Sequence, residues 1–180
     1  MSTHASSAQV TALVAEILGR GSAVRFKVTG GSMRPLVPSG ARVVVGPVDT
    51  AKLRAGDVVY FKNTQGAPVL HRIVRVDLDS AGRKVFRTKG DALIVFDDPV
   101  APDQVLGRAV RIERPLPGGR RWVLDLDTRR WRWAGAVVAV LQLVGAKVLL
   151  KLGVFRKKCC RLKGQTAGRD EAGPSEIHRQ

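Results

Sequence analysis

Val28-Thr29-Gly30-Gly31-Ser32-Met33-Arg34-Pro35 is the stretch around which the rest of the chain is organised. It continues the segment 23–29, in which apolar and basic residues alternate with a period of two, and this alternation predicts a half-buried β-strand. The strand runs into two glycines, whose backbones leave room for another chain to approach, and then into a serine. Taken alone, this sequence is typical of a tight turn with an incidental serine.

Two later segments supply the partners that a reactive serine needs. His71, one of three histidines, falls inside the strand-like run 70–74, and Asp91 and Asp97 follow the next expected strand. A serine hydroxyl is unreactive at neutral pH unless a base lies within hydrogen-bonding distance, and the base needs a carboxylate to orient it. The three residue types therefore form a candidate nucleophile, general base and orienting acid.

Together these motifs resemble the signal peptidase I superfamily, which also contains self-cleaving repressors. The resemblance covers residues 25–114 and is greatest for the branch of the endoplasmic reticulum and archaea, whose general base is histidine rather than lysine. It is carried, in order, by Gly31-Ser32-Met33-Arg34-Pro35, Gly56-Asp57-Val58-Val59, His71-Arg72-Ile73-Val74, and Lys89-Gly90-Asp91 with Asp97 six residues on. It implies a serine endopeptidase that cleaves precursor peptides, either signal or leader peptides, after small residues.

The resemblance also implies a role for each candidate residue. Ser32 is the nucleophile, His71 the general base, Asp97 the third catalytic member, and Asp91 a supporting acid that holds the loop. An unperturbed imidazole titrates near pH ~6.5, so a histidine base needs no deep burial to accept a proton at neutral pH. Asp98 is adjacent to Asp97, and one inserted residue would exchange the two, so both remain candidates.

The oxyanion hole is expected to use the backbone amide of Ser32. Many relatives add a hydroxyl from the residue two positions before the nucleophile, but Gly30 stands there and has none. Two alternatives stay open. Either this hydroxyl is replaced by a backbone amide of Gly30 or Gly31 or by the Thr29 hydroxyl, or the oxyanion hole is weaker. Met33 and the strand after it are expected to line a shallow pocket for a small substrate residue, while the peptide pairs along an edge strand.

The composition bounds the partners. The chain has 180 residues and a formal net charge of +16, which attracts anionic membranes, nucleic acids or acidic peptides. No metal or other cofactor is expected, because the three histidines are scattered and no ligand spacing is present. Cys159 and Cys160 are adjacent and build no disulfide framework, so a reducing compartment is the simpler interpretation.

Closely spaced turn signals predict a mainly β fold, a coiled antiparallel β-domain over residues 23–128. Residues 1–22 are expected to hold an amphipathic helix over 8–18, packed on the β-domain and ended by Gly19. A loop with a short apolar centre is expected at 91–102. Strands are expected at 23–29, 41–45, 58–62, 69–76, 84–88, 105–113 and 121–126.

The segment 129–158 differs in kind, because it is apolar and flanked by basic residues. Between 133 and 146 its only polar residue is Gln142, and its length is just sufficient to cross a bilayer. Its tryptophans and basic flanks favour a membrane interface, with spanning and interfacial helices both open. A helix packed on the β-domain ranks below membrane contact. The tail 159–180 is expected to be disordered.

The start of the chain lacks the basic and apolar segments of a secretory signal, so attachment to an anionic membrane is expected through 133–155. The side of the membrane stays open, with the cytoplasmic face a serious alternative. The resemblance implies that a self-cleaving repressor has a lysine base and an N-terminal DNA-binding domain. Here position 71 is histidine, and the 22 residues before the first expected strand are too few for a helix-turn-helix unit. A repressor is therefore discounted, and no nucleic-acid partner is expected. A non-catalytic membrane- or peptide-binding relative is the remaining alternative.

Overall fold

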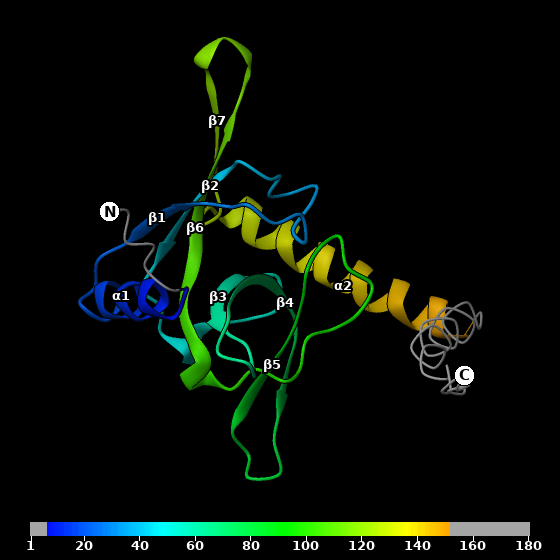
Figure 1. Ribbon diagram of the computed structural model, residues 1–180. Helices are drawn as coiled ribbons and strands as arrows, with labels where there is room; N and C mark the ends of the chain where they lie inside the picture. Colours follow the sequence, from blue (N-terminus) through cyan, green and yellow to red (C-terminus); the bar gives the residue numbers. More distant parts are fainter. Residues whose placement is uncertain (1–6, 152–180) are drawn as a thin grey trace, which may run out of the picture. The chain divides into compact units, whose positions relative to one another are not determined.

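The computed structural model describes residues 7–151, and the side chains of residues 9–144 within them. Over this range the fold is mainly β, with one antiparallel sheet of seven strands and two α-helices (Figure 1). The chain divides after Leu143 into two units, and the first of them contains the sheet. The end of the expected 129–158 segment and the tail 159–180 lie outside the described residues.

Each strand lies within two residues of its expected bounds, so the prediction of a mainly β fold is confirmed. The strands are β1 (Val24–Lys27), β2 (Arg42–Gly46), β3 (Val58–Lys62), β4 (Pro68–Leu78), β5 (Lys84–Lys89), β6 (Val105–Pro115) and β7 (Arg121–Asp125). The α-helices are α1 (Ser7–Gly19) and α2 (Arg129–Lys151), and short 3-10 turns occur at η1 (Thr50–Lys52), η2 (Pro102–Gln104) and η3 (Pro117–Gly119).

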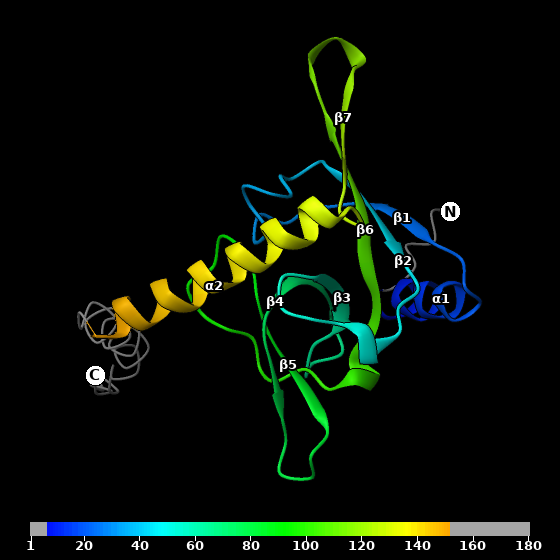
Figure 2. The ribbon, with the colours of Figure 1, turned by 180° about the vertical axis from the view of Figure 1, so that it is seen from behind.

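Strand β6 is the hub of the sheet, because it pairs with β2, β3 and β7. The strand order is β1-β2-β6-β3-β4-β5, with β7 joined to β6 beyond this path. Register shifts interrupt the pairing at Val44/Val45, Tyr60/Phe61 and Ile73/Arg75. A bulge bends a strand and increases its twist, which explains why the sheet coils instead of lying flat (Figure 2).

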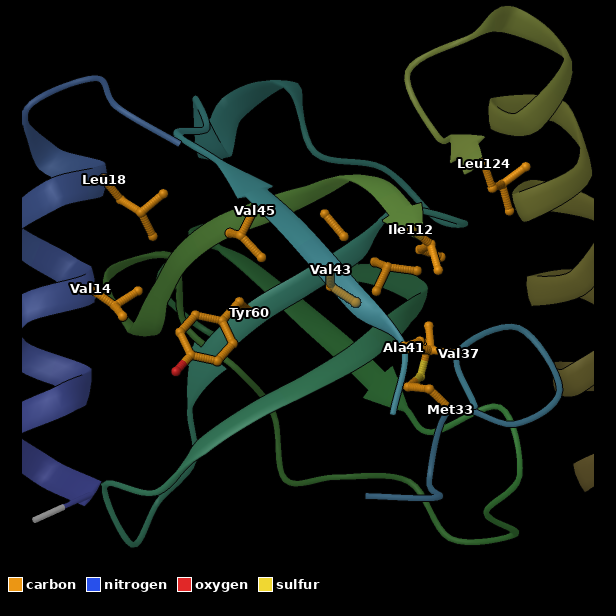
Figure 3. Close-up of a cluster of buried hydrophobic side chains, with 12 residues drawn as sticks. Val14, Leu18, Met33, Val37, Ala41, Val43, Val45, Tyr60, Ile112 and Leu124 are labelled. Carbon is orange, nitrogen blue, oxygen red and sulfur yellow. The ribbon is translucent and has the colours of Figure 1, made fainter. Parts of the chain in front are cut away.

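Side chains are buried on both faces of the sheet. One cluster includes Val14 and Leu18 of α1 together with Val43 and Tyr60 (Figure 3). A second cluster contains Leu53, Val59, Phe61, Ile73, Phe86 and Val100. Successive side chains of a strand point to opposite faces, so β3 contributes to both clusters in alternation.

Helix α1 lies against the β-domain, as the sequence predicted. Thr11, Val14 and Leu18 are buried along one stripe, whereas Val10 and Leu13 are 47% and 57% exposed. The apolar face that the sequence shows is therefore only partly covered. The helix ends at Gly19, the expected terminator.

Helix α2 packs on the β-domain as far as Gln142, which is the arrangement that the sequence ranked below membrane contact. Gly135 approaches Gly56 so closely that a Cβ on Gly135 would lie 2.7 Å from the Gly56 carbonyl oxygen. Ala139, one turn further along, is fully buried. Among the described residues, no helix is both long enough and apolar enough to cross a bilayer.

Candidate active site

Ser32 lies in a series of turns that joins β1 to β2. The Arg34 N–H donates to the Gly31 carbonyl oxygen at 3.2 Å, and the Val37 N–H donates to that of Met33 at 2.8 Å. These local hydrogen bonds turn the chain back after the two glycines and leave Ser32 half-buried. The serine is thus held on a folded turn beside the sheet rather than within a strand.

The turn of Ser32 is bonded to the loop that follows β5. The Ala92 N–H donates to the Ser32 carbonyl oxygen at 2.8 Å. A Cβ placed on Gly90 would lie 2.7 Å from that same oxygen and 3.0 Å from Nε2 of His71. The Ser32 carbonyl oxygen and Nε2 of His71 therefore both lie next to Gly90, and only a glycine at position 90 leaves the space for them.

His71 and Asp97 form the central contact of the site. His71 projects from β4, and its Nδ1 lies 2.7 Å from Oδ2 of Asp97. An ionised carboxylate only accepts hydrogen bonds, so Nδ1 of His71 carries the ring hydrogen and is the donor of this bond. Nε2 then keeps its lone pair and lies beside Gly90, which also adjoins the Ser32 carbonyl oxygen.

Asp97 is itself fixed by Thr88 of β5. The Thr88 hydroxyl donates to Oδ2 of Asp97 at 2.7 Å, and the Asp97 N–H donates to the Thr88 carbonyl oxygen at 3.0 Å. The His71 side chain is 8% exposed and that of Asp97 is 24% exposed. A residue fixed both by its carboxylate and by its backbone N–H orients the imidazole without rearrangement, and partial burial strengthens its effect on a developing imidazolium charge.

Asp91 bonds to Arg72, the residue after His71, and to α2. Its two oxygens accept from Arg72 Nε at 2.8 Å and Nη2 at 2.7 Å, and both side chains are only 5% exposed. Arg72 also donates to the Gly56 carbonyl oxygen at 2.9 Å. Gln142 of α2 donates to Asp91 at 2.8 Å. The supporting acid therefore ties β4, the turn before β3 and α2 to the residue beside Gly90.

Lys89 is a buried cation next to this site and is 5% exposed. Its Nζ donates to the Leu93 carbonyl oxygen at 2.7 Å and to that of Gly90 at 3.3 Å. Burial lowers the pKa of the Lys89 ammonium below its ordinary value, and the charges of Asp91 and Asp97 offset this only in part. Lys89 thus holds the 90–93 loop through two of its carbonyl oxygens, and the Ala92 N–H of the same loop bonds to Ser32.

The remaining candidates lie elsewhere. Asp98 is exposed and accepts from the Thr64 hydroxyl at 3.2 Å, so it is Asp97 and not Asp98 that meets His71. Gly30 is exposed, with nothing within 4 Å of the place of a Cβ, whereas Gly31 faces the Arg34 side chain. The Met33 side chain is 2% exposed in the core cluster of Figure 3. The expectation that Met33 lines an open pocket is corrected, because its apolar side chain is buried with the core of β2 and β6.

Sequence reasoning missed four members of this network: Arg72, Thr88, Lys89 as a loop support, and Gln142. Two of them carry a signal in the sequence. Arg72 is a charge inside an apolar strand, and Gln142 is the single polar residue of an apolar helix segment, so both need a partner when buried. Thr88 and Lys89 give no such signal, because strands with one exposed face commonly carry these residue types.

Comparison with protein-family models, with curated proteins and with solved structures found no match to this chain. Over the residues that the structure describes, no group of three histidine, cysteine or acidic side chains is placed to hold a metal ion. Any functional assignment therefore depends on the geometry of the site and on the motifs in the sequence.

Proposed function

We propose that the protein is a serine endopeptidase of the signal-peptidase type that cleaves precursor peptides after small residues. The observation that carries the proposal is the 2.7 Å contact of His71 Nδ1 with Asp97, which leaves Nε2 beside the Ser32 turn. Nucleophile, base and orienting acid come from three separate segments that the sheet brings together. An arrangement of this kind serves acyl transfer on unrelated folds.

In the proposed reaction the Ser32 hydroxyl attacks the scissile carbonyl carbon while His71 Nε2 takes its proton. Asp97 stabilises the imidazolium, and the Ser32 backbone amide stabilises the oxyanion. The imidazolium then protonates the leaving amine, which departs and leaves an acyl-enzyme on Ser32. Water, deprotonated by the same imidazole, hydrolyses the acyl-enzyme and restores the serine.

An extended substrate can reach Ser32 along β1. Among the described strands it pairs with β2 alone, and it runs directly into the turn that carries the serine. The main-chain groups of its free edge supply the hydrogen bonds that an added peptide strand needs. The free edge of β1 therefore supports a peptide substrate rather than a small molecule.

A fluorophosphonate probe tests the proposed activity, because it reacts with serines that an adjacent base has activated. We expect the full chain to be labelled at Ser32, and labelling to be lost in Ser32→Ala and in His71→Ala. Ser6→Ala, in the polar segment before α1, serves as the control and should label like the unchanged chain. A folded protein that the probe does not label would favour a non-catalytic peptide-binding relative instead.

We propose in addition that the protein contacts an anionic membrane surface through the outer face of α2. Trp133, Val137, Val140 and Leu141 follow the spacing of one helical face and are 53–75% exposed. Exposed apolar side chains on a helix of a chain with net charge +16 suit an anionic lipid interface. The buried face of the same helix is occupied by the β-domain.

Vesicle flotation at low salt tests membrane contact. The full chain should float with vesicles that contain phosphatidylserine, and Val137→Gln/Val140→Gln/Leu141→Gln should not. Val10→Gln/Leu13→Gln, which removes exposed apolar residues from α1, is the matched control. Point substitutions are preferable to removing the helix, because Ala139 is part of the packed structure. A full chain that stays off these vesicles would exclude membrane contact.

A further inference from the structure

A cavity of about 440 Å³ lies where the first half of α2 covers the β-domain. Its walls are mainly apolar, and Leu36, Leu126, Trp131 and Val138 contribute to them. The charged side chains of its lining are four arginines and two aspartates: Arg72, Arg108, Arg114, Arg132, Asp57 and Asp91. The lining therefore carries an excess of positive charge inside a largely apolar space.

Two of the four guanidinium groups are neutralised by carboxylates. Arg72 forms the bidentate salt bridge with Asp91. Arg108 donates to Asp127 at 2.7 Å and lies 3.8 Å from Asp57. Because these pairs are complete, the positive excess of the cavity resides on the other two arginines.

Arg114 is held in place without being neutralised. Its guanidinium donates to the carbonyl oxygens of Pro35 and Leu36, with Nη2 at 2.6 Å from the Pro35 oxygen, and stacks over the Trp122 ring. Carbonyl oxygens and an aromatic face orient a cation but carry no net negative charge. Within the part of the chain that the structure describes, Arg114 forms no ion pair.

Arg132 carries a donor without an acceptor. Its Nε is buried and has no hydrogen-bond partner among the described residues. Its charge lowers the pKa of Asp127, but less than the hydrogen bond and charge of Arg108 do. The Nε–H and the adjacent Nη–H form the edge of a guanidinium that binds a carboxylate through two parallel hydrogen bonds.

A second unpartnered group belongs to Gln142, which also lines this cavity. Oε1 of Gln142 is buried without a donor among the residues described, although Nε2 of the same side chain is bonded to Asp91. A buried acceptor and a buried donor without partners are each unfavourable, so a ligand that satisfies both is favoured. A phosphodiester group supplies acceptor atoms for Arg132 but no donor for Gln142. A peptide supplies both, as an acidic side chain and a main-chain N–H.

We propose that this cavity binds an acidic side chain of the precursor peptide, with its carboxylate on Arg132 and a main-chain N–H on Gln142. This inference rests on the proposed peptidase function and names a substrate feature for it. The cavity adjoins the site through two segments: Pro35 is three residues after Ser32, and Asp91 follows Gly90. A peptide whose scissile bond lies at Ser32 therefore passes close to the arginines.

Binding measured without cleavage tests the subsite. The probes are fluorescein-labelled decapeptides of alanine and serine with one glutamate placed at each position in turn, each matched by a glutamine peptide. They are titrated by anisotropy into the full chain carrying Ser32→Ala. At one position or more, the glutamate peptide should bind about tenfold or more tightly than its glutamine counterpart, as expected for a charge-assisted, two-bonded pair.

Substitutions then locate the preference. Arg132→Gln should reduce the glutamate preference to less than about twofold. Arg132→Lys keeps the charge but loses the bidentate geometry of the guanidinium, so it should retain only part of the preference. Arg120→Gln removes an exposed arginine from the turn before β7 and should leave the preference unchanged. A circular dichroism melt of each variant shows whether it is folded.

Three outcomes would overturn the proposal: equal binding of glutamate and glutamine peptides at every position, a preference that persists in folded Arg132→Gln, or loss of phosphatidylserine vesicle binding in Arg132→Gln without change in peptide discrimination. The last outcome would assign the cavity to a lipid headgroup. Probe labelling of Ser32 together with the first outcome overturns the subsite alone. Absence of labelling together with a glutamate preference overturns the peptidase and leaves a peptide-binding site.

Discussion

The backbone N–H of Ala92 donates a 2.8 Å hydrogen bond to the carbonyl oxygen of Ser32. This bond joins the candidate nucleophile to the loop that carries Gly90 and Asp91. Lys89 holds the loop by a hydrogen bond to the Leu93 carbonyl oxygen. Arg72 and Gln142 hold it through their bonds to Asp91. The position of Ser32 relative to His71 therefore depends on a short loop as much as on the sheet.

Gly90→Ala tests this dependence. A methyl group there would lie 2.7 Å from the Ser32 carbonyl oxygen and 3.0 Å from His71 Nε2, so the serine turn, the ring or the loop must move. A displacement of about 1 Å at reacting groups can lower turnover roughly 10²-fold, and we expect a loss of this order in peptide cleavage. Gly19→Ala, where the added methyl group meets nothing within 4 Å, is the control. Full activity in Gly90→Ala would contradict the proposed arrangement.

Asp97→Asn and Asp98→Asn are expected to differ sharply in kcat. An amide at position 97 keeps the shape but removes the charge that stabilises the imidazolium and lets the ring adopt the wrong tautomer, so turnover should fall roughly 10³–10⁴-fold. Asp98 is exposed and accepts from the Thr64 hydroxyl at 3.2 Å, and its replacement should change kcat less than about threefold. Steady-state cleavage of one peptide by both variants makes the comparison. Similar losses would show that the 97–98 segment moves when substrate binds.

Asp91→Asn is expected to destabilise the fold strongly. It leaves the Arg72 guanidinium, which is 5% exposed, without its carboxylate, and breaking such a buried pair costs about 3–5 kcal/mol. Urea unfolding followed by circular dichroism measures the change. Glu16→Gln makes the same acid-to-amide change in the exposed Glu16–Arg20 pair and should leave the midpoint nearly unchanged. An equal, small effect in both variants would mean that α2 and β4 do not depend on the Asp91 network.

Lys89→Met should alter how stability varies with alkaline pH. Burial lowers the pKa of Lys89 in the folded chain, so between that lowered pKa and 10.5 the unfolded chain binds more protons than the folded one. Stability of the wild type relative to Lys89→Met should therefore rise as pH increases through this window. Asp91 and Asp97, whose charges act on Lys89, are present in both chains, and so is Tyr60, whose pKa burial raises. Thermal unfolding from pH 7 to 10.5 measures the difference, and a constant or falling difference would contradict it.

The strands were predictable because their determinants are local. Alternation of apolar and polar side chains specifies which residues face a core, and the turn sequences specify where each strand stops. Ser32, His71 and an acid after Lys89-Gly90-Asp91 were also visible, because each motif keeps its own residue types and spacing along the chain. Local sequence thus determined the mainly β fold and the three segments of the candidate site.

Tertiary structure alone decided which groups meet. Asp97 and Asp98 are equivalent in sequence, and the bonds of Asp97 with Thr88 turn only that side chain toward His71. Met33 was expected in a pocket wall, but the turn that carries it places its side chain in the core cluster, where it is 2% exposed. The apolar pattern of α2 predicted that the helix buries apolar side chains, but it did not decide between a membrane and the β-domain. Gly56 and Gly135 let the helix approach the β-domain, and such a contact between residues far apart in sequence depends on the three-dimensional fold.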